Sequence, residues 1–77
     1  GEVSLVAVVP PSVWVGVGLA SLADLVGGTV VALTRFGECR VPGGSTLVQA
    51  DDLIHLAVPS GVVDDLDDIL ERGPSDD

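Results

Sequence analysis

Length, composition and charge limit what this chain can be. It has 77 residues, 47% of them apolar, and twelve acidic side chains against three arginines give a net charge of −9. A chain this short buries only about 60% of its unfolded surface, so we expect a second copy, or the rest of a larger protein, to cover some of its apolar surface. The charge excludes a nucleic-acid-binding surface and attachment to an anionic bilayer, because both require a basic patch.

Cysteine content and hydropathy predict the compartment. A single cysteine, Cys39, cannot form an internal disulfide, and no apolar run reaches the roughly 18 residues that span a bilayer. We therefore predict a cytoplasmic protein with no direct membrane insertion. The sequence has no methionine, so we expect a piece of a longer polypeptide. Within it we predict one domain over residues 1–72 and a flexible acidic tail over residues 73–77.

The first half of the chain predicts two strands and a helix. Residues 3–9 form a continuous apolar run that ends at Pro10 and Pro11, which predicts a strand covered on both faces. Apolar residues three and four positions apart predict a short helix over 19–25, closed by Gly27 and Gly28. The β-branched run 29–34 predicts the second strand.

The second half predicts two more strands and a second helix. A turn at residues 36–38 leads into a short strand at 39–41, and after a Pro-Gly-Gly loop the apolar run 53–58 predicts the fourth strand. Ser60 is the predicted N-cap of a final helix that ends at Gly73. The order predicts an α+β domain of the form β-α-β-β-β-α.

Reactive side chains do not form a catalytic set. His55 stands alone in a predicted strand, where we expect a structural role on a sheet face, and Cys39 is interpreted as a small buried hydrophobe. Adjacent aspartates such as Asp51 and Asp52 do not have the alternating spacing of a calcium loop, so we interpret them as solvated acids. We predict that the chain is not an enzyme and holds no metal.

Two arginines suggest a binding site. Arg35 and Arg40 flank a turn and precede Val41 and Pro42. At a symmetric interface each arginine is presented twice, which suits an anionic ligand. The alternative is that both arginines neutralise neighbouring acids. We therefore name Arg35, Arg40, Val41 and Pro42 as candidate ligand-binding residues.

Apolar side chains suggest where two copies meet. Trp14 follows the double proline and suits either a core or an interface. The final helix carries an apolar stripe opposite its acids. The candidate residues of a dimer interface are Trp14, Val62, Val63 and Leu66.

With these pieces placed, the chain resembles the TrkA-C (RCK-C) domain, the C-terminal regulatory domain of TrkA-type potassium uptake proteins. The resemblance rests on Val15-Gly16 leading into L-A-S-L at 19–22, T-V-V-A-L-T-R at 29–35, Val41-Pro42, and T-L-V-Q-A-D-D-L-I at 46–54. It covers nearly the whole chain, from residue 2 to residue 70.

The resemblance implies a β-α-β-β-β-α domain that forms a homodimer and follows an N-terminal nucleotide-binding domain. It also implies a role at the inner face of the cell membrane, through a membrane potassium transporter as partner. Two hypotheses follow. The domain either regulates transport by sensing a ligand and dimerising, or it is a purely structural dimerisation domain without a small-molecule ligand.

The family also suggests a ligand. Some members bind cyclic di-AMP at the dimer cleft, and Arg40, Val41 and Pro42 match the part of the pattern nearest to it. Three departures count against that ligand here: Val17 replaces a lysine, Asp51 replaces a glycine, and the first helix lacks its terminal arginine. A bisphosphate beside a chain of charge −9 needs local positive charge. We expect no cofactor in the domain itself.

Overall fold

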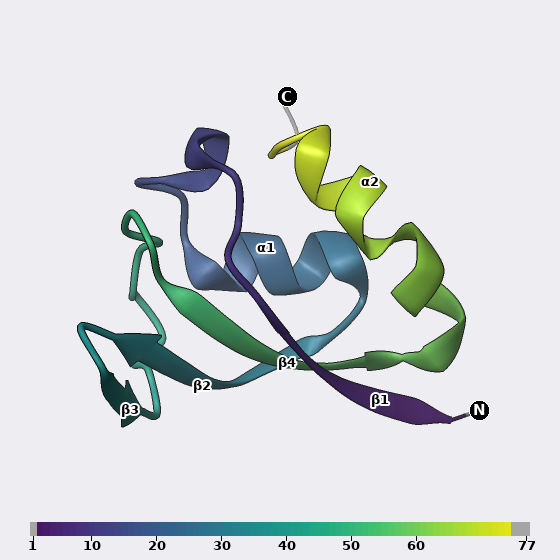
Figure 1. Cartoon of the computed structure of the whole chain (residues 1–77), viewed down its shortest axis with the longest axis horizontal. Coiled ribbons are helices and arrows are strands. Elements are labelled where there is room, and N and C mark those ends of the chain that lie inside the picture. The colour runs from purple at the N-terminus through teal and green to yellow at the C-terminus, as the bar shows by residue number, and fades with distance from the viewer. Residues whose placement is uncertain (1, 75–77) are drawn as a thin grey trace.

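Four strands and two α-helices follow one another in the predicted β-α-β-β-β-α order (Figure 1), which confirms the α+β fold class. The structure is a computed structural model that describes residues 2–74. Two 3₁₀ segments, η1 and η2, precede the α-helices. The elements are β1 (Val3–Val8), η1 (Ser12–Trp14), α1 (Leu19–Val26), β2 (Thr29–Arg35), β3 (Glu38–Arg40), β4 (Leu53–Pro59), η2 (Ser60–Asp65) and α2 (Leu66–Glu71).

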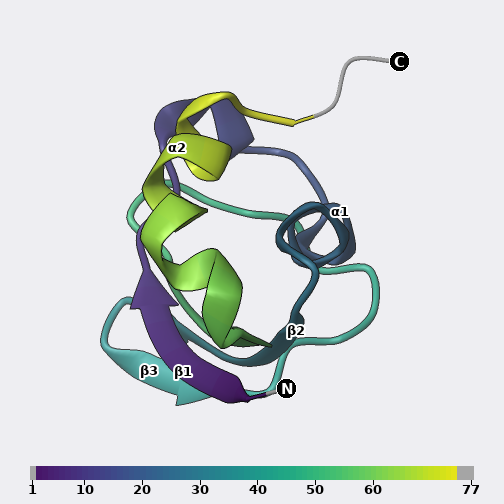
Figure 2. The same cartoon turned by 90° about the vertical axis from the view of Figure 1, so that its right-hand side faces the viewer.

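The strands form one antiparallel sheet in the order β1-β4-β2-β3. β4 pairs with β1 from Val3↔Pro59 to Val8↔Ile54, and with β2 from Thr29↔Ala57 to Thr34↔Leu53. Both α-helices lie on the same side of the sheet (Figures 1 and 2). We call the side away from the helices the outer face.

The core lies between the sheet and the helices. Trp14 is fully buried there, and its indole Nε1 donates a hydrogen bond of 2.9 Å to the carbonyl of Leu70 in α2. The indole thus joins η1 to the last helix, 56 residues later. The other buried members of this cluster are Leu19, Leu22, Val26, Leu33, Val48, Ile54, Leu56, Val58, Leu66 and Leu70.

The β2–β3 connection is a two-residue hairpin turn at Phe36 and Gly37, one residue shorter than the predicted turn at 36–38. Phe36 and Gly37 both have positive φ, 52° and 78°, as a type I′ turn requires at its two central positions. The register Thr34↔Cys39 follows directly from this turn. β3 begins at Glu38, one residue earlier than expected.

Two adjacent glycines end α1 as predicted, for different physical reasons. Gly27 adopts the left-handed conformation, with φ of 70°, at the helix C-terminus. Gly28 has an ordinary backbone conformation but lies against β4: a Cβ built there would stand 2.5 Å from the carbonyl oxygen of Ala57 and 2.8 Å from a methyl of Val58. Gly28 therefore lets the start of β2 pack closely on β4.

The prediction that residues 3–9 form a strand covered on both faces is wrong in one respect. β1 is an edge strand whose side chains alternate between exposed and half-buried. Val3 and Leu5 point away from the helices and are largely exposed. An uninterrupted apolar run does not distinguish a strand buried on both faces from a strand whose outer face is apolar and open.

The predicted N-cap at Ser60 is also wrong. The Ser60 hydroxyl hydrogen-bonds the hydroxyl of Ser4 at 2.7 Å, so it ties η2 to β1 and caps no helix. The segment Ser60–Asp65 is 3₁₀, and the α-helix begins only at Leu66. Gly61 and two β-branched valines within this segment disfavour an α-helix.

The described chain turns at Gly73, just after α2. The amide of Gly73 donates to the carbonyl of Leu70 at 3.0 Å, and Gly73 has a positive φ of 78°. Residues 75–77 of the predicted acidic tail lie outside the described residues.

Among residues 2–74 no helix is long and apolar enough to cross a bilayer.

Substitution of Gly28 tests the close contact between the start of β2 and β4. We expect Gly28→Ala to lower the free energy of unfolding by about 1–3 kcal/mol, because backbone and a packed valine must move to admit the methyl group. Urea denaturation followed by circular dichroism measures the change. Gly44→Ala is the matched control, since a Cβ there meets nothing within 4 Å. Equal stability of the two variants would contradict the close packing.

Candidate functional site

The end of β2 is tied to the loop before β4 by an ion pair. The guanidinium of Arg35 donates from Nε to Oδ1 of Asp52 at 2.8 Å and from Nη2 to Oδ2 at 2.7 Å. Nη2 also donates to the carbonyl of Leu47 at 3.0 Å. This two-pronged geometry fixes both side chains, since the planar fork of arginine matches a carboxylate.

Burial makes this pair structural. The Asp52 side chain is fully buried, and its Oδ2 also accepts the backbone N–H of Gln49 at 2.8 Å. The hydrogen bond from Arg35 holds the pKa of Asp52 below its usual value against the opposing effect of burial. The same hydrogen bond raises the pKa of Arg35. The interpretation of Asp52 as a solvated acid is therefore wrong, and this residue is the one that sequence reasoning missed.

The neighbouring Asp51 shows why the chain can turn before this pair. Asp51 is exposed and has a φ of +66°, in the left-handed region that favours glycine. This is the position at which the sequence departs from the family pattern by replacing glycine. Aspartate is one of the few other residues that adopt this conformation readily.

The other three candidate ligand residues lie beyond the hairpin. Arg40 is exposed and its Nη2 lies 3.2 Å from a carboxylate oxygen of Glu38, also exposed. Val41 is 83% exposed. Pro42 lines a hollow of about 280 Å³. This hollow lies between α1, the start of β2, and Gly43 and Gly44, the two glycines that follow Pro42. Arg40, Val41 and Pro42 thus form a continuous accessible segment.

The two arginines differ in how firmly their acidic partners hold them. Arg35 is held by Asp52, while Arg40 makes only a solvent-exposed pair, which is weak. Both arginines have an acidic partner, as the alternative interpretation expects. Arg40 is close enough to Asp52 to contribute slightly to its lowered pKa. Arg40 is the more accessible of the two, with 53% of its side chain exposed against 16% for Arg35.

The four candidate interface residues are divided between core and surface. Trp14 and Leu66 are buried within this chain and present almost no surface to a second copy. Val62 is half-buried, and Val63 is 37% exposed on η2. These residues do not form one continuous exposed patch.

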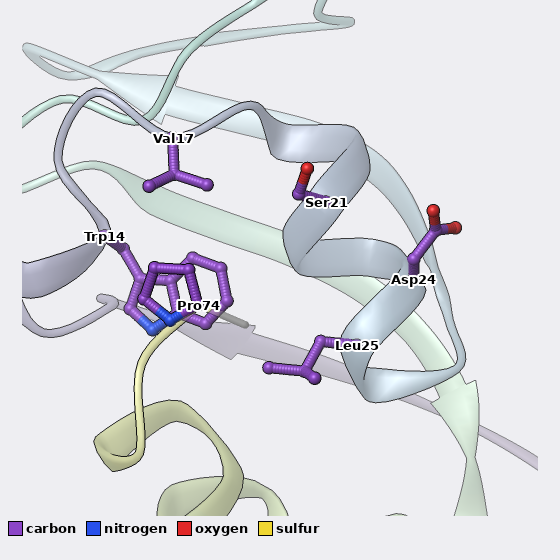
Figure 3. Close-up of a pocket in the computed structure, with 6 residues that line it drawn as sticks. All are labelled: Trp14, Val17, Ser21, Asp24, Leu25 and Pro74. Atoms are coloured by element: carbon purple, nitrogen blue, oxygen red, sulfur yellow. The ribbon is translucent and has the colours of Figure 1, made fainter. Parts of the chain in front are cut away.

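A second hollow, of about 520 Å³, lies where η1, α1 and the C-terminal segment meet (Figure 3). Its lining is mainly apolar, and α1 adds the hydroxyl of Ser21 and the carboxylate of Asp24. Their spacing of three residues, visible in the sequence, places both on one side of the helix. The full lining is Trp14, Val17, Ser21, Asp24, Leu25 and Pro74.

The histidine and the cysteine have different environments. His55 is half-buried on the outer face, and its Nε2 lies 2.9 Å from the Thr34 hydroxyl, as expected for a structural residue on a sheet. Cys39 is exposed, so its interpretation as a buried hydrophobe is wrong. The reason is that β3 is a short edge strand with all three residues exposed. Among residues 2–74 no group of His, Cys, Asp and Glu could hold a metal ion.

Comparison with known proteins connects this geometry to a family. The family described as the TrkA-C domain matches residues 3–71, from the start of β1 to the end of α2. The Trk system potassium uptake protein TrkA of Streptomyces coelicolor is 31% identical over 77 residues, which is 100% of this chain and 34% of that protein. The chain therefore spans about a third of the length of this curated relative.

Neutralising Asp52 tests the ion pair. The pKa of Asp52 is lowered in the folded state, so its stabilising effect is present above the unfolded value near pH 4 and is lost as the pH falls through the folded value. We expect Asp52→Asn to lower the free energy of unfolding at pH 7 by about 1–3 kcal/mol. We also expect the free energy of unfolding of this variant to fall less than that of the wild type as the pH is lowered.

Urea denaturation between pH 7 and pH 2.5 measures both effects. The matched control is Asp51→Asn, because Asp51 is exposed and asparagine tolerates its positive φ. We expect this control to change the stability by at most about 0.5 kcal/mol. Identical pH profiles for the two variants would contradict the structural role of the pair.

Proposed function

The chain belongs to the TrkA-C domain family, and we propose that it is a non-catalytic regulatory domain of a TrkA-type potassium transport protein. The observation that carries the proposal is the family match over residues 3–71. In this proposal the domain is cytoplasmic and follows an N-terminal nucleotide-binding domain. It reaches the inner face of the membrane through a potassium transporter partner.

The chemistry of the described residues supports a role without catalysis. His55 is engaged by Thr34 and Asp52 by Arg35, while Cys39 is the cross-strand partner of Thr34 on the exposed edge strand β3. An enzyme needs a nucleophile or metal, a base and an orienting group brought together. Among residues 2–74 no acidic side chain is hydrogen-bonded to His55 to orient it, so regulation by binding fits this domain better.

The proposed mechanism is a change in the pairing of two copies. A ligand that bridges two subunits shifts their arrangement only by the difference in its affinity for the two states. The accessible segment Arg40, Val41 and Pro42 is the proposed contact, since Arg40 is freed from its exposed partner at little cost. In a dimer this segment occurs twice and presents two arginines. Cyclic di-AMP, with two phosphates, is the candidate anion.

The second candidate is a dimerisation domain without a small-molecule ligand. One specific observation favours it: Arg35, the other arginine of the predicted site, is already neutralised by Asp52. Each copy then offers a single accessible arginine at this segment within a chain of charge −9. The two candidates differ in whether any ligand stabilises the fold.

A chimera tests the regulatory role. The chain replaces the matching third of the Streptomyces coelicolor relative, and potassium uptake is measured at limiting external potassium. We expect the chimera to restore the regulation that a version lacking this third has lost, because the match covers the chain from end to end. A chimera that behaves like the truncated protein would contradict the proposal.

Thermal shift separates the two candidates. Nucleotides, including cyclic di-AMP, are added to the wild-type chain and to Arg40→Ala. A ligand at about 100 times its dissociation constant adds about 2.7 kcal/mol of stability. We expect a shift in the wild type that Arg40→Ala abolishes and that Arg72→Ala, the loss of another exposed arginine, leaves intact. Absence of a shift with every nucleotide selects the structural candidate.

A further inference from the structure

The strand β1 leaves one of its two edges without a partner strand. It lies at one end of the sheet order β1-β4-β2-β3 (purple in Figure 1), and among residues 2–74 only β4 pairs with it. An edge of this kind offers backbone N–H and C=O groups to a segment that arrives in extended conformation.

The hydrogen bonds to β4 show which residues face the free edge. The amide of Ser60 donates to the carbonyl of Glu2 at 3.0 Å, so these two residues form a hydrogen-bonded pair just before β1. In an antiparallel ladder such pairs alternate with pairs that exchange no hydrogen bond. The backbone groups of the odd-numbered residues of β1 therefore point away from β4. These residues are Val3, Leu5 and Ala7.

The free edge of β1 lacks the features that keep an exposed edge from pairing. Those features are short length, charged side chains, proline and bulges. The opposite edge strand, β3, has two of them, because it is three residues long and two of these, Glu38 and Arg40, are charged. In contrast, β1 has six uncharged residues, and its register with β4 is uninterrupted. The edge of β1 is therefore free to take a further strand.

An acidic hollow lies beside the end of this edge. It has a volume of about 370 Å³ and lies between the C-terminal half of β1 and α2. Its lining includes Ala7 of the free edge and no residue of β4, which places the hollow on the free side of β1. The exposed carboxylates of Asp67 and Glu71 line it from α2, on one side of which their spacing of four residues places them.

The surroundings of this edge favour a basic, amphipathic strand. Side chains of an added strand alternate between the two faces of the sheet. On the outer face they lie beside Leu5, which is 77% exposed and suits an apolar neighbour. On the helix side they lie toward Asp67 and Glu71, with which lysine or arginine forms charge-assisted hydrogen bonds. The net charge of −9 also attracts such a segment from a distance.

A second copy of this chain does not supply such a strand. Its free edges are those of β1 and β3. Residues 2–9 include the acid Glu2 and no basic residue, so a second β1 brings no positive charge to the hollow. The second β3 is only three residues long and carries an acid beside its arginine. The occupant that fits therefore comes from a different protein.

We propose that the free edge of β1 binds an extended segment of a partner protein in which apolar residues alternate with lysine or arginine. The segment lies antiparallel to β1, the more stable pairing, and its apolar residues exchange backbone hydrogen bonds with Val3, Leu5 and Ala7. Its basic side chains reach Asp67 and Glu71. This binding requires neither the dimer nor the ligand of the proposed function.

A synthetic peptide tests the proposal. The probe is Lys-Val-Lys-Val-Lys-Val-Lys, capped at both ends and labelled with fluorescein, and fluorescence anisotropy measures its dissociation constant with the 77-residue chain. We expect binding that weakens as salt is added. The same peptide with glutamate in place of lysine is expected not to bind. Proline in place of the central valine removes an N–H that pairs with β1, so we expect at least tenfold weaker binding.

Variants of the chain locate the site. Leu5→Pro removes an N–H that β4 does not use, and we expect it to raise the dissociation constant at least tenfold, whereas Leu5→Ala keeps the N–H and has a smaller effect. Asp67→Asn combined with Glu71→Gln is expected to raise it about fivefold. The matched control is Asp64→Asn combined with Asp68→Asn, which has the same spacing outside the hollow and is expected to change it by at most about twofold. Circular dichroism verifies that each variant is folded.

Hydrogen exchange of the backbone amides reports on the edge directly. We expect the peptide to slow the exchange of the Leu5 and Ala7 amides, because each gains a hydrogen-bond partner. Absence of peptide binding, or equal binding by folded Leu5→Pro and the wild type, overturns the proposal. So do equal effects of the two acid pairs, which show attraction by net charge alone. Protection of these amides that rises with the concentration of the free chain assigns the edge to a second copy and also overturns it.

Discussion

The fold depends on one constraint: the helices of this chain cover only one face of its sheet. α1 has eight residues and α2 has six, and both pack on the side where Ile54, Leu56 and Val58 of β4 are buried. Trp14 holds α2 in this position, because its buried indole packs in the core and its Nε1 is hydrogen-bonded to the carbonyl of Leu70 in α2. The outer face is thus left without a helix over it, and Leu5 on that face is largely exposed.

A second interaction, the ion pair of Arg35 and Asp52, shapes the region next to the hairpin. It holds the loop before β4 against the end of β2, and Arg35 also binds the carbonyl of Leu47 in that loop. Arg35, one of the two arginines of the predicted anion site, therefore stabilises the fold. Arg40 is left as the more accessible arginine of that site. The regulatory and the purely structural hypotheses differ in what this single arginine does in a dimer.

Much of the fold was predictable because local signals were strong. Double proline, paired glycines and β-branched runs set the ends of the strands and of α1 to within about two residues. The segment Arg40, Val41 and Pro42 is accessible, and its binding role stays a prediction that rests on the family resemblance. The failures have a common cause, since Asp52, Cys39 and Ser60 depend on neighbours distant in sequence. Asp52 is buried by Arg35, 17 residues away, and Ser60 bonds Ser4, 56 residues away.

The sequence by itself determined the element order, the hairpin turn and the absence of a basic surface, because turn residues, hydrophobic period and charge act locally or simply add. Only the tertiary structure decided which apolar side chains are covered and which arginine remains accessible. Leu5 and Val6 are equally apolar in the sequence, yet the pleat points them to opposite faces, and helices pack on one face alone. Burial is a property of the assembled layers, and no single segment encodes it.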